Sequence, residues 1–329
     1  MSVRPAFPVV PASFFGTILG VIGLGNCWRL AAKLWALPAG IGEGIMLLGS
    51  VLWGLLVFFF LGKWRWQRAE ARAELQHPVL CCFIGLAPVT GVLVALAVAP
   101  YSHPVAVALW ALGAAGQSLF SLYRTGQLWK GGRDPGTTTP VLYLPTVAGN
   151  FVSSIGASAL GFPLLAPLFF GAGVFSWLAI ESIVLHRLLI HDPLPKPLRP
   201  TLGIQLAPAV VGCVAYLGLT KGTPDLFAQC LLGYGLLQAL MLIRLLPWLC
   251  EQPFSASYWA YTFGVDALAL AVLRFVERGL GGPYPGLAIA VFVLANLVVG
   301  GIFFASLWAL VRGKYLPPGL IPAASPKPA

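Results

Sequence analysis

The sequence predicts an all-α membrane protein with ten transmembrane helices. Of its 329 residues, 58% are hydrophobic and 9% are charged, whereas soluble domains carry roughly 25% charged residues. Apolar runs of about 20 residues, enough to cross a hydrocarbon core of roughly 30 Å, recur between residues 13 and 311. Since the polar gaps between these runs are short, no separate soluble domain is expected.

The apolar runs define each span in turn. We expect the ten spans at residues 13–36, 39–61, 79–99, 104–128, 141–161, 164–190, 203–219, 224–246, 254–276 and 285–311. They form one transmembrane domain over 13–311, preceded by a cytoplasmic segment, 1–12, and followed by a cytoplasmic tail, 312–329. The first segment lacks the pattern of a cleaved signal peptide, and the proline-rich tail is expected to be disordered.

The basic residues predict the orientation of the chain. An even number of spans leaves both termini on one side, and fifteen of the 20 Lys and Arg residues fall in the loops and tails of that side. Because basic loops favour the cytoplasm, both termini are predicted to be cytoplasmic. The opposite connections, such as 37–38 and 161–163, are short, so the spans pair into five hairpins whose odd-numbered helices all run outward.

Several other functional classes are disfavoured by the residues present. The net charge of +10 is spread over loops, and no clustered basic face suggests nucleic acid as a partner. The six cysteines include no CxxC pair and have no His at ligand spacing, so no metal site or cofactor is predicted. Motifs of proteases, hydrolases and phosphate loops are absent, and we therefore expect no enzyme and no catalytic residue.

The odd-numbered spans share a repeated pattern of prolines and glycines. Their centres recur about every 55 to 65 residues, a spacing that suggests one unit used several times. Three of them carry a proline within the span, the ninth has a glycine at the matching depth, and the first has two glycines: Pro88, Pro145, Pro208, Gly264, Gly16 and Gly20. A proline bends a helix and frees a carbonyl that protein or cavity water must satisfy.

Two interpretations of these proline and glycine positions remain open. Membrane helices tolerate proline in general, so the prolines can be incidental. Alternatively, five kinked odd helices line a water-accessible passage and five even helices surround them. The ninth span poses the same choice, because Phe263 beside Gly264 is either a plug in a narrow passage or part of a packed helix.

Eight sequence blocks, in order, resemble a known family. These are ASFFGTILGVIGLG, HPVL, GQLWKGG, TTPVLYLPTVAGNFVSS, FFGAGVFSWLAIESIVLHRL, LGIQLAPAVV, GYGLLQALMLIRLLPW and SYWAYTFGV. They resemble the bacterial TehA proteins of the plant slow anion channel and yeast malate transporter superfamily. The resemblance implies five hairpins in a quasi-five-fold arrangement around a central pore, a homotrimer with one pore per subunit, and a place in the bacterial inner membrane.

The resemblance also implies roles for individual residues. The phenylalanine of the TFG block, Phe263, would occlude the pore, and the FG of the first helix corresponds to Phe15 and Gly16. Asp266 follows Phe263 by three residues, so it lies about 60° round the helix from it. An ionised carboxylate there would repel an anion, so Asp266 either turns to a neighbouring helix, protonated or paired, or makes this pore different.

Other intramembrane polar residues are expected to hold helices together. Glu181, in an even-numbered span, is predicted to pair with a basic group such as Arg187 or Arg244. The amides of Gln205, Asn150 and Asn296 are expected to bridge helices rather than to contact ions.

Two functions follow as hypotheses. The first is a passive channel for small monovalent anions such as chloride or nitrate, gated by Phe263, with tellurite resistance associated through the family name. The second is a coupled carrier that exports C4-dicarboxylates or tellurite oxyanions, for which Asp266 is the clear titratable residue in an odd-numbered span. Small anions and the lipid bilayer are the partners in both cases.

Overall fold

A computed structural model describes residues 8–317 and 319–320 of the chain. Within this part all regular secondary structure is helical, which confirms the predicted all-α class. The α-helices are α1 (Phe15–Trp35), α2 (Ala39–Trp66), α3 (Arg68–Gln76), α4 (Leu86–Val98), α5 (His103–Leu128), α6 (Gly149–Ala159), α7 (Ala166–Ile190), α8 (Ala207–Leu219), α9 (Leu226–Leu249), α10 (Thr262–Glu277) and α11 (Tyr284–Val311).

Short segments of tighter or wider helix precede several of these α-helices. All have 3-10 geometry except η5, which is a π-helix. They are η1 (Ala12–Phe14), η2 (Leu80–Gly85), η3 (Pro135–Thr137), η4 (Pro140–Leu142), η5 (Leu144–Ala148), η6 (Lys196–Leu206) and η7 (Ala256–Tyr261). Each odd-numbered span of the sequence therefore begins with a 3-10 segment before its α-helix.

Nine helices in the described residues are long and apolar enough to cross a membrane. Four of them join a 3-10 segment to the α-helix that follows, as in Lys196–Leu219. The predicted span 141–161 is not among the nine. It consists of η4, η5 and α6, and its α-helical part has 11 residues.

The connection predicted between the first two hairpins is more ordered than expected. The predicted spans 39–61 and 79–99 leave residues 62–78 as one of the basic loops of the terminus side, but α2 continues to Trp66 and α3 occupies Arg68–Gln76. The loop prediction is therefore wrong for most of this stretch. The sequence of α3, RAEARAELQ, consists mainly of strong helix formers, and its charge signals exposure rather than irregular structure.

The spanning helices fall into two classes by burial. In α1, α4, α8 and α10, with their 3-10 extensions, 61% to 78% of the apolar window is buried. In α2, α5, α7, α9 and α11 the buried share is only 11% to 28%. The residues of α6 are also mostly buried. We call α1, α4, α6, α8 and α10 the inner helices and the other five the outer helices.

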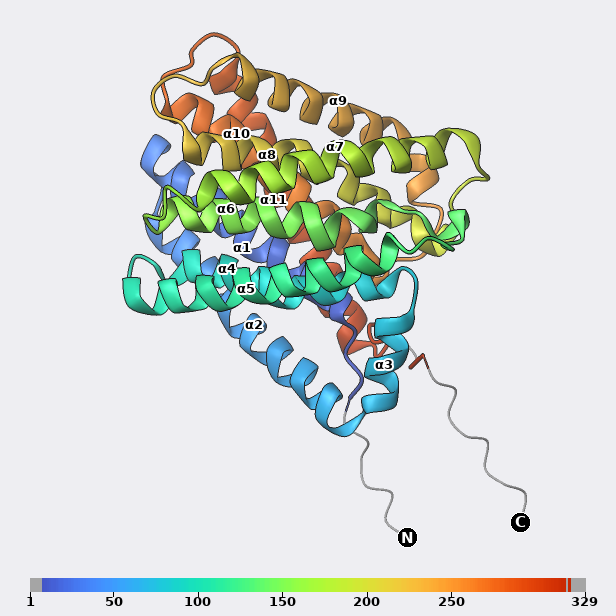
Figure 1. The fold of residues 1–329 in the computed structure, drawn as a ribbon. Coiled ribbons are helices and arrows are strands. Elements are labelled where there is room, and N and C mark those ends of the chain that lie inside the picture. The colour runs from blue at the N-terminus through green and yellow to red at the C-terminus, as the bar shows by residue number, and fades with distance from the viewer. Residues whose placement is uncertain (1–7, 318, 321–329) are drawn as a thin grey trace, which may run out of the picture.

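The inner helices contact one another in a closed sequence. Helix α1 packs against α4, α4 against α6, α6 against α8, α8 against α10, and α10 returns to α1. Each inner helix also packs against the outer helix that follows it in the chain, from α1 with α2 to α10 with α11. Figure 1 shows these helices side by side in one bundle, with α2 crossing obliquely below the others.

Both ends of the described chain lie against α3 (Figure 1). The backbone N–H of Ala12 donates to Glu74 at 2.7 Å, and the N–H of Leu320 donates to Glu70 at 2.9 Å. Lys63 forms a buried ion pair with Glu74 and donates to the carbonyl of Val10 at 2.9 Å. The two ends therefore share one side of the bundle. The predictions for residues 1–7, 318 and 321–329 fall outside the described residues.

Candidate functional site

Two cavities lie end to end within the inner helices. The terminus-side cavity, of about 150 Å³, extends from η1 and the 3-10 segments to α10. The far-side cavity, of about 370 Å³, is lined by α1, α4, α6, α8, α10 and the turn after α4. Every lining residue of both cavities comes from an inner helix or from the segments joined to it. Phe263 and Val211 line both cavities, so these two side chains lie at the boundary between them.

The lining of the terminus-side cavity is apolar and carries no charged side chain. Its polar groups are few, with Ser13, Thr201 and Ser257 among them. The rest is mainly aliphatic and aromatic surface from α1, η2, η5, η6 and η7. An ion that entered would lose much of its hydration without a charged side chain to replace it.

The far-side cavity contrasts with this because it contains several charged groups. Its lining includes Arg29, Lys33 and Arg274 as cations and Asp266 as an acid. Arg274 is paired with Glu277 at 2.6 Å, whereas none of the ion pairs among the described residues involves Lys33. Lys33 is therefore the cation of this cavity whose charge is least compensated by an ion pair.

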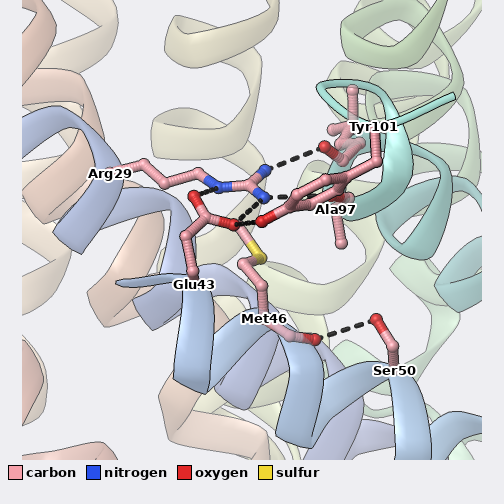
Figure 2. Close-up of polar contacts among 7 residues, drawn as sticks. Arg29, Glu43, Met46, Ser50, Ala97 and Tyr101 are labelled. Atoms are coloured by element: carbon pink, nitrogen blue, oxygen red, sulfur yellow. Dashed lines mark hydrogen bonds and ion pairs between the residues drawn. The ribbon is translucent and has the colours of Figure 1, made fainter. Parts of the chain in front are cut away.

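Arg29 is held by a network at the rim of the far-side cavity (Figure 2). Its Nε and Nη2 donate to the two carboxylate oxygens of Glu43 at 2.8 and 2.7 Å, a bidentate pair. The same guanidinium donates to the carbonyls of Leu96 and Ala97, and Tyr101 donates to Glu43 at 2.7 Å. These bonds tie α1, α2 and the end of α4 together, so Arg29 acts mainly as a fixed structural cation.

Phe263 lies at the start of α10, directly after η7. The ring is half-buried between the two cavities. The next residue, Gly264, allows α10 to approach the preceding inner helix closely, since a Cβ there would lie 3.0 Å from the Cβ of Leu206. On the other side Thr262 donates to the carbonyl of Trp259 at 2.8 Å and packs over Gly20 of α1. The backbone that carries Phe263 is thus packed on both flanks.

The remaining residues predicted for the site fall into two groups. Gly16 and Pro208 line the terminus-side cavity. The others are packed between helices and are not among the lining residues of either cavity. Pro145 is buried within η5, Phe15 faces the ring of Phe60 on α2, and Pro88 packs against Gly116 of α5.

The three prolines have a common local role. Each lies in the first turn of a helix that follows a tighter segment: Pro88 in α4, Pro145 in η5 and Pro208 in α8. The spans therefore change helix type at these points, which redirects the chain at low cost.

Asp266 lines the far-side cavity, and its carboxylate has no hydrogen-bond partner. The residue is 1% exposed, and neither carboxylate oxygen has a hydrogen-bond partner. Its backbone carbonyl accepts from the Cys27 thiol at 3.2 Å. Gly23 of α1 faces the carboxylate, because a Cβ there would lie 2.7 Å from Oδ2. The sequence left open whether Asp266 pairs with a neighbouring charge. Among the described residues it forms no such pair.

Glu181 corrects a prediction. It forms no ion pair among the described residues, so the expected pairing with Arg187 or Arg244 is wrong. Its oxygens instead accept from four neutral donors, which lie just before η5 and on α7, η6 and α9: Tyr143 at 2.6 Å, Trp177 at 2.8 Å, Gln205 at 2.9 Å and Tyr234 at 2.5 Å. These donors satisfy the hydrogen-bonding capacity of the buried carboxyl group.

The three amides bridge helices, as predicted. Gln205 links η6 to Glu181 on α7. Asn150 of α6 accepts from Gln117 of α5 at 3.2 Å, and Asn296 of α11 accepts from Trp28 of α1 at 2.8 Å. Each bond joins an inner to an outer helix, which fixes the two layers against each other.

The chain matches a family model described as voltage-dependent anion channel (SLAC1) over residues 9–307. A tellurite resistance protein TehA homolog of Haemophilus influenzae is 34% identical over 316 residues, which cover 96% of this chain and 95% of that protein. The guard cell S-type anion channel SLAC1 of Arabidopsis thaliana is 24% identical, over 90% of this chain and 55% of that protein. An uncharacterized transporter of Methanocaldococcus jannaschii is 30% identical, over 65% of this chain and 69% of that protein.

Proposed function

The chain belongs to the SLAC1 family of voltage-dependent anion channels, and from this premise we propose that it passes small monovalent anions through a pore within each subunit. It is a multi-pass membrane protein with several apolar spanning helices. The single observation that carries the proposal is the pair of cavities that meet at Phe263 and Val211 and are lined by the inner helices alone.

The proposed architecture has ten spans in five hairpins around the pore. The closed sequence of contacts among the inner helices supports a quasi-five-fold arrangement, with η4, η5 and α6 as the fifth inner span. The outer helices then face lipid, in agreement with exposed side chains such as Leu112 and Phe175. Apolar faces of this kind also supply the surface for the homotrimer that the family resemblance implies.

The proposed gate is the ring of Phe263. Its position at the boundary of the two cavities supports this role, because the ring and Val211 are the side chains that line both volumes. An aromatic ring moves by side-chain rotation on a fast timescale, and the packed backbone around Gly264 and Thr262 can stay fixed while it does.

Selectivity for chloride- or nitrate-like anions is proposed from charge. The far-side cavity carries more cationic than acidic groups, and a plant relative bears the name of an S-type anion channel. With basic loops in the cytoplasm, as the sequence predicts, the terminus-side cavity faces the cytoplasm of a bacterial inner membrane and the far-side cavity faces outward. Tellurite resistance is associated through the name of one relative.

Flux through reconstituted vesicles tests this proposal. Phe263→Ala should raise chloride and nitrate flux well above wild type, and reversal potentials under anion substitution then report selectivity with the ring removed. Phe175→Ala is a matched control, because Phe175 is 75% exposed on the outer helix α7. Folded Phe263→Ala protein whose flux equals that of wild type would contradict the gate.

A coupled carrier of dicarboxylates or tellurite oxyanions is the second candidate. The buried, unpartnered carboxyl of Asp266 in the far-side cavity is the observation that favours it, since coupling needs a titratable group in the pathway. Anion uptake driven by a proton gradient alone, and lost in Asp266→Asn, would replace the channel by a carrier.

A further inference from the structure

We infer that Asp266 is a proton-binding residue of the anion pathway, and that its ionised carboxylate holds the far-side cavity closed to anions until it takes up a proton. This inference rests on the proposed function. It concerns the step that follows Phe263, because the two residues lie on the same helix and line the same cavity.

The first support is the isolation of the carboxyl group. Asp266 is 1% exposed, and its two oxygens have no hydrogen-bond partner. A buried carboxylate normally receives several donors or a cation, and leaving it without them is costly. The protonated form removes most of this cost, whereas the ionised form needs water or an ion from the cavity beside it.

The second support is that no cation of the neighbouring elements forms an ion pair with Asp266 among the described residues. From α1 the cavity receives Arg29 and Lys33, and from α10 Arg274, but no ion pair joins any of them to Asp266. Helix α1 also presents Gly23 and the thiol of Cys27, which donates to the Asp266 backbone.

The other packed elements are uncharged at this point. Helices α4, α6 and α8 contribute only apolar residues to the cavity: Leu93, Leu96, Ile155, Ala159, Val211 and Val214. Helix α11 contributes none, and its Asn296 is engaged with Trp28. The one acid in the lining is therefore Asp266, so its protonation state sets whether an anion meets a negative charge there.

The distance along the helix makes this charge effective. Asp266 follows Phe263 by three residues, a rise of about 4.5 Å. An anion that has just passed the ring would lie within a few ångströms of the carboxyl, where like charges repel strongly in a partly desolvated space. A proton from water in the far-side cavity converts the carboxylate to a neutral carboxylic acid and removes the repulsion.

The test measures chloride and nitrate flux in vesicles at equal pH on both sides, from pH 8 to pH 5, with Phe263→Ala as the background. Flux should rise about tenfold as the pH falls, since one nearby charge is removed. Adding Asp266→Asn should give the high flux at every pH, and Asp266→Glu should keep a pH response. If Asp266→Asn protein does not fold, Asp266→Ser provides the neutral side chain.

Asp225→Asn is the matched control. Asp225 lies outside the cavities and caps α9, accepting from the N–H of Ala228 at 3.0 Å and from Tyr216 at 2.5 Å. This variant should keep the pH response of the background. A pH profile that Asp266→Asn leaves unaltered would overturn the inference while the channel stands.

Two further outcomes separate this inference from the proposed function. Absence of flux through folded Phe263→Ala protein at every pH would overturn the proposed channel itself. Accumulation of anions driven by a proton gradient alone would overturn the switch in favour of coupling, because a switch changes the rate of passage but adds no driving force.

Discussion

The two cavities on either side of Phe263 differ in what they offer an ion. The terminus-side cavity is smaller and uncharged, and it is enclosed by 3-10 segments and aromatic rings. The far-side cavity has more than twice the volume and carries the charged groups. Under the proposed function, the terminus-side cavity would select ions by the cost of dehydration, and the far-side cavity would select them by the sign of their charge. The difference teaches that Phe263 and Val211 lie between two chemically distinct spaces, one uncharged and one charged.

The largest loss of stability is expected from a substitution at Glu74, beside the terminus-side cavity. This residue pairs with Lys63 in a buried site and binds the N–H of Ala12, next to the cavity residue Ser13. Because Glu74→Gln leaves the Lys63 charge buried without its counterion, we expect a loss of about 3–5 kcal/mol in the free energy of unfolding.

Thermal unfolding in detergent micelles measures this loss. The control is Glu277→Gln at the far side, whose partner Arg274 is 43% exposed in its side chain, and which should cost about 0–1 kcal/mol. Equal shifts in the two variants would contradict a special role for the terminus-side pair.

Placing an acid in the uncharged cavity should remove the difference between the two sides. Ala260 of η7 lines the terminus-side cavity, and Ala260→Asp in the Phe263→Ala background should lower anion flux by about tenfold or more at neutral pH through repulsion. Ala260→Asn has nearly the same shape without the charge and should lower flux much less. Similar flux in the two variants would mean that anions do not pass this cavity.

A smaller side chain at Val211 should weaken the separation between the two cavities. With Phe263 intact, Val211→Ala removes part of a side chain that lines both cavities and should raise basal flux, though by less than Phe263→Ala does. Val214→Ala is the control, because Val214 lines the far-side cavity alone. Flux assays on both variants distinguish a contact at the boundary from a general loosening of α8, which would raise both.

The smallest effect is expected from the uncompensated cation of the far-side cavity. Lys33→Gln should lower flux about two- to threefold at low ionic strength by weakening the local attraction of anions. The effect should disappear near 1 M salt, where the screening length is about 3 Å. Lys221→Gln, outside the cavity lining, is the control, and a salt-independent loss in Lys33→Gln would contradict an electrostatic role.

Much of the fold follows from hydropathy alone. The outer helices are nearly continuous apolar runs, so their predicted limits agree closely with the structure, as for α5 (His103–Leu128) and α11 (Tyr284–Val311). The helix α3 was missed because it is short and charged, and hydropathy does not distinguish such a helix from a loop.

The candidate site was only partly accessible from the sequence. Phe263 and Asp266 stand out because an aromatic–glycine pair and a single acid are conspicuous in an apolar span. Val211 is one valine among many in the sequence. Its position at the boundary between the two cavities depends on how α8 packs against α10. The donors around Glu181 come from four separate segments, so no spacing along the chain signals them.

The seam between α1 and α10 has a mechanical consequence. Thr262 packs against Gly20, and Asp266 packs against Gly23 about one turn further along α1. Because both contacts depend on the missing side chains of the glycines, they fix the position of α10 along α1. Sliding α10 along α1 would drive these side chains into the adjoining backbone. The backbone of Phe263 is therefore held in place, so the proposed movement of its ring would require no sliding of α10 along α1.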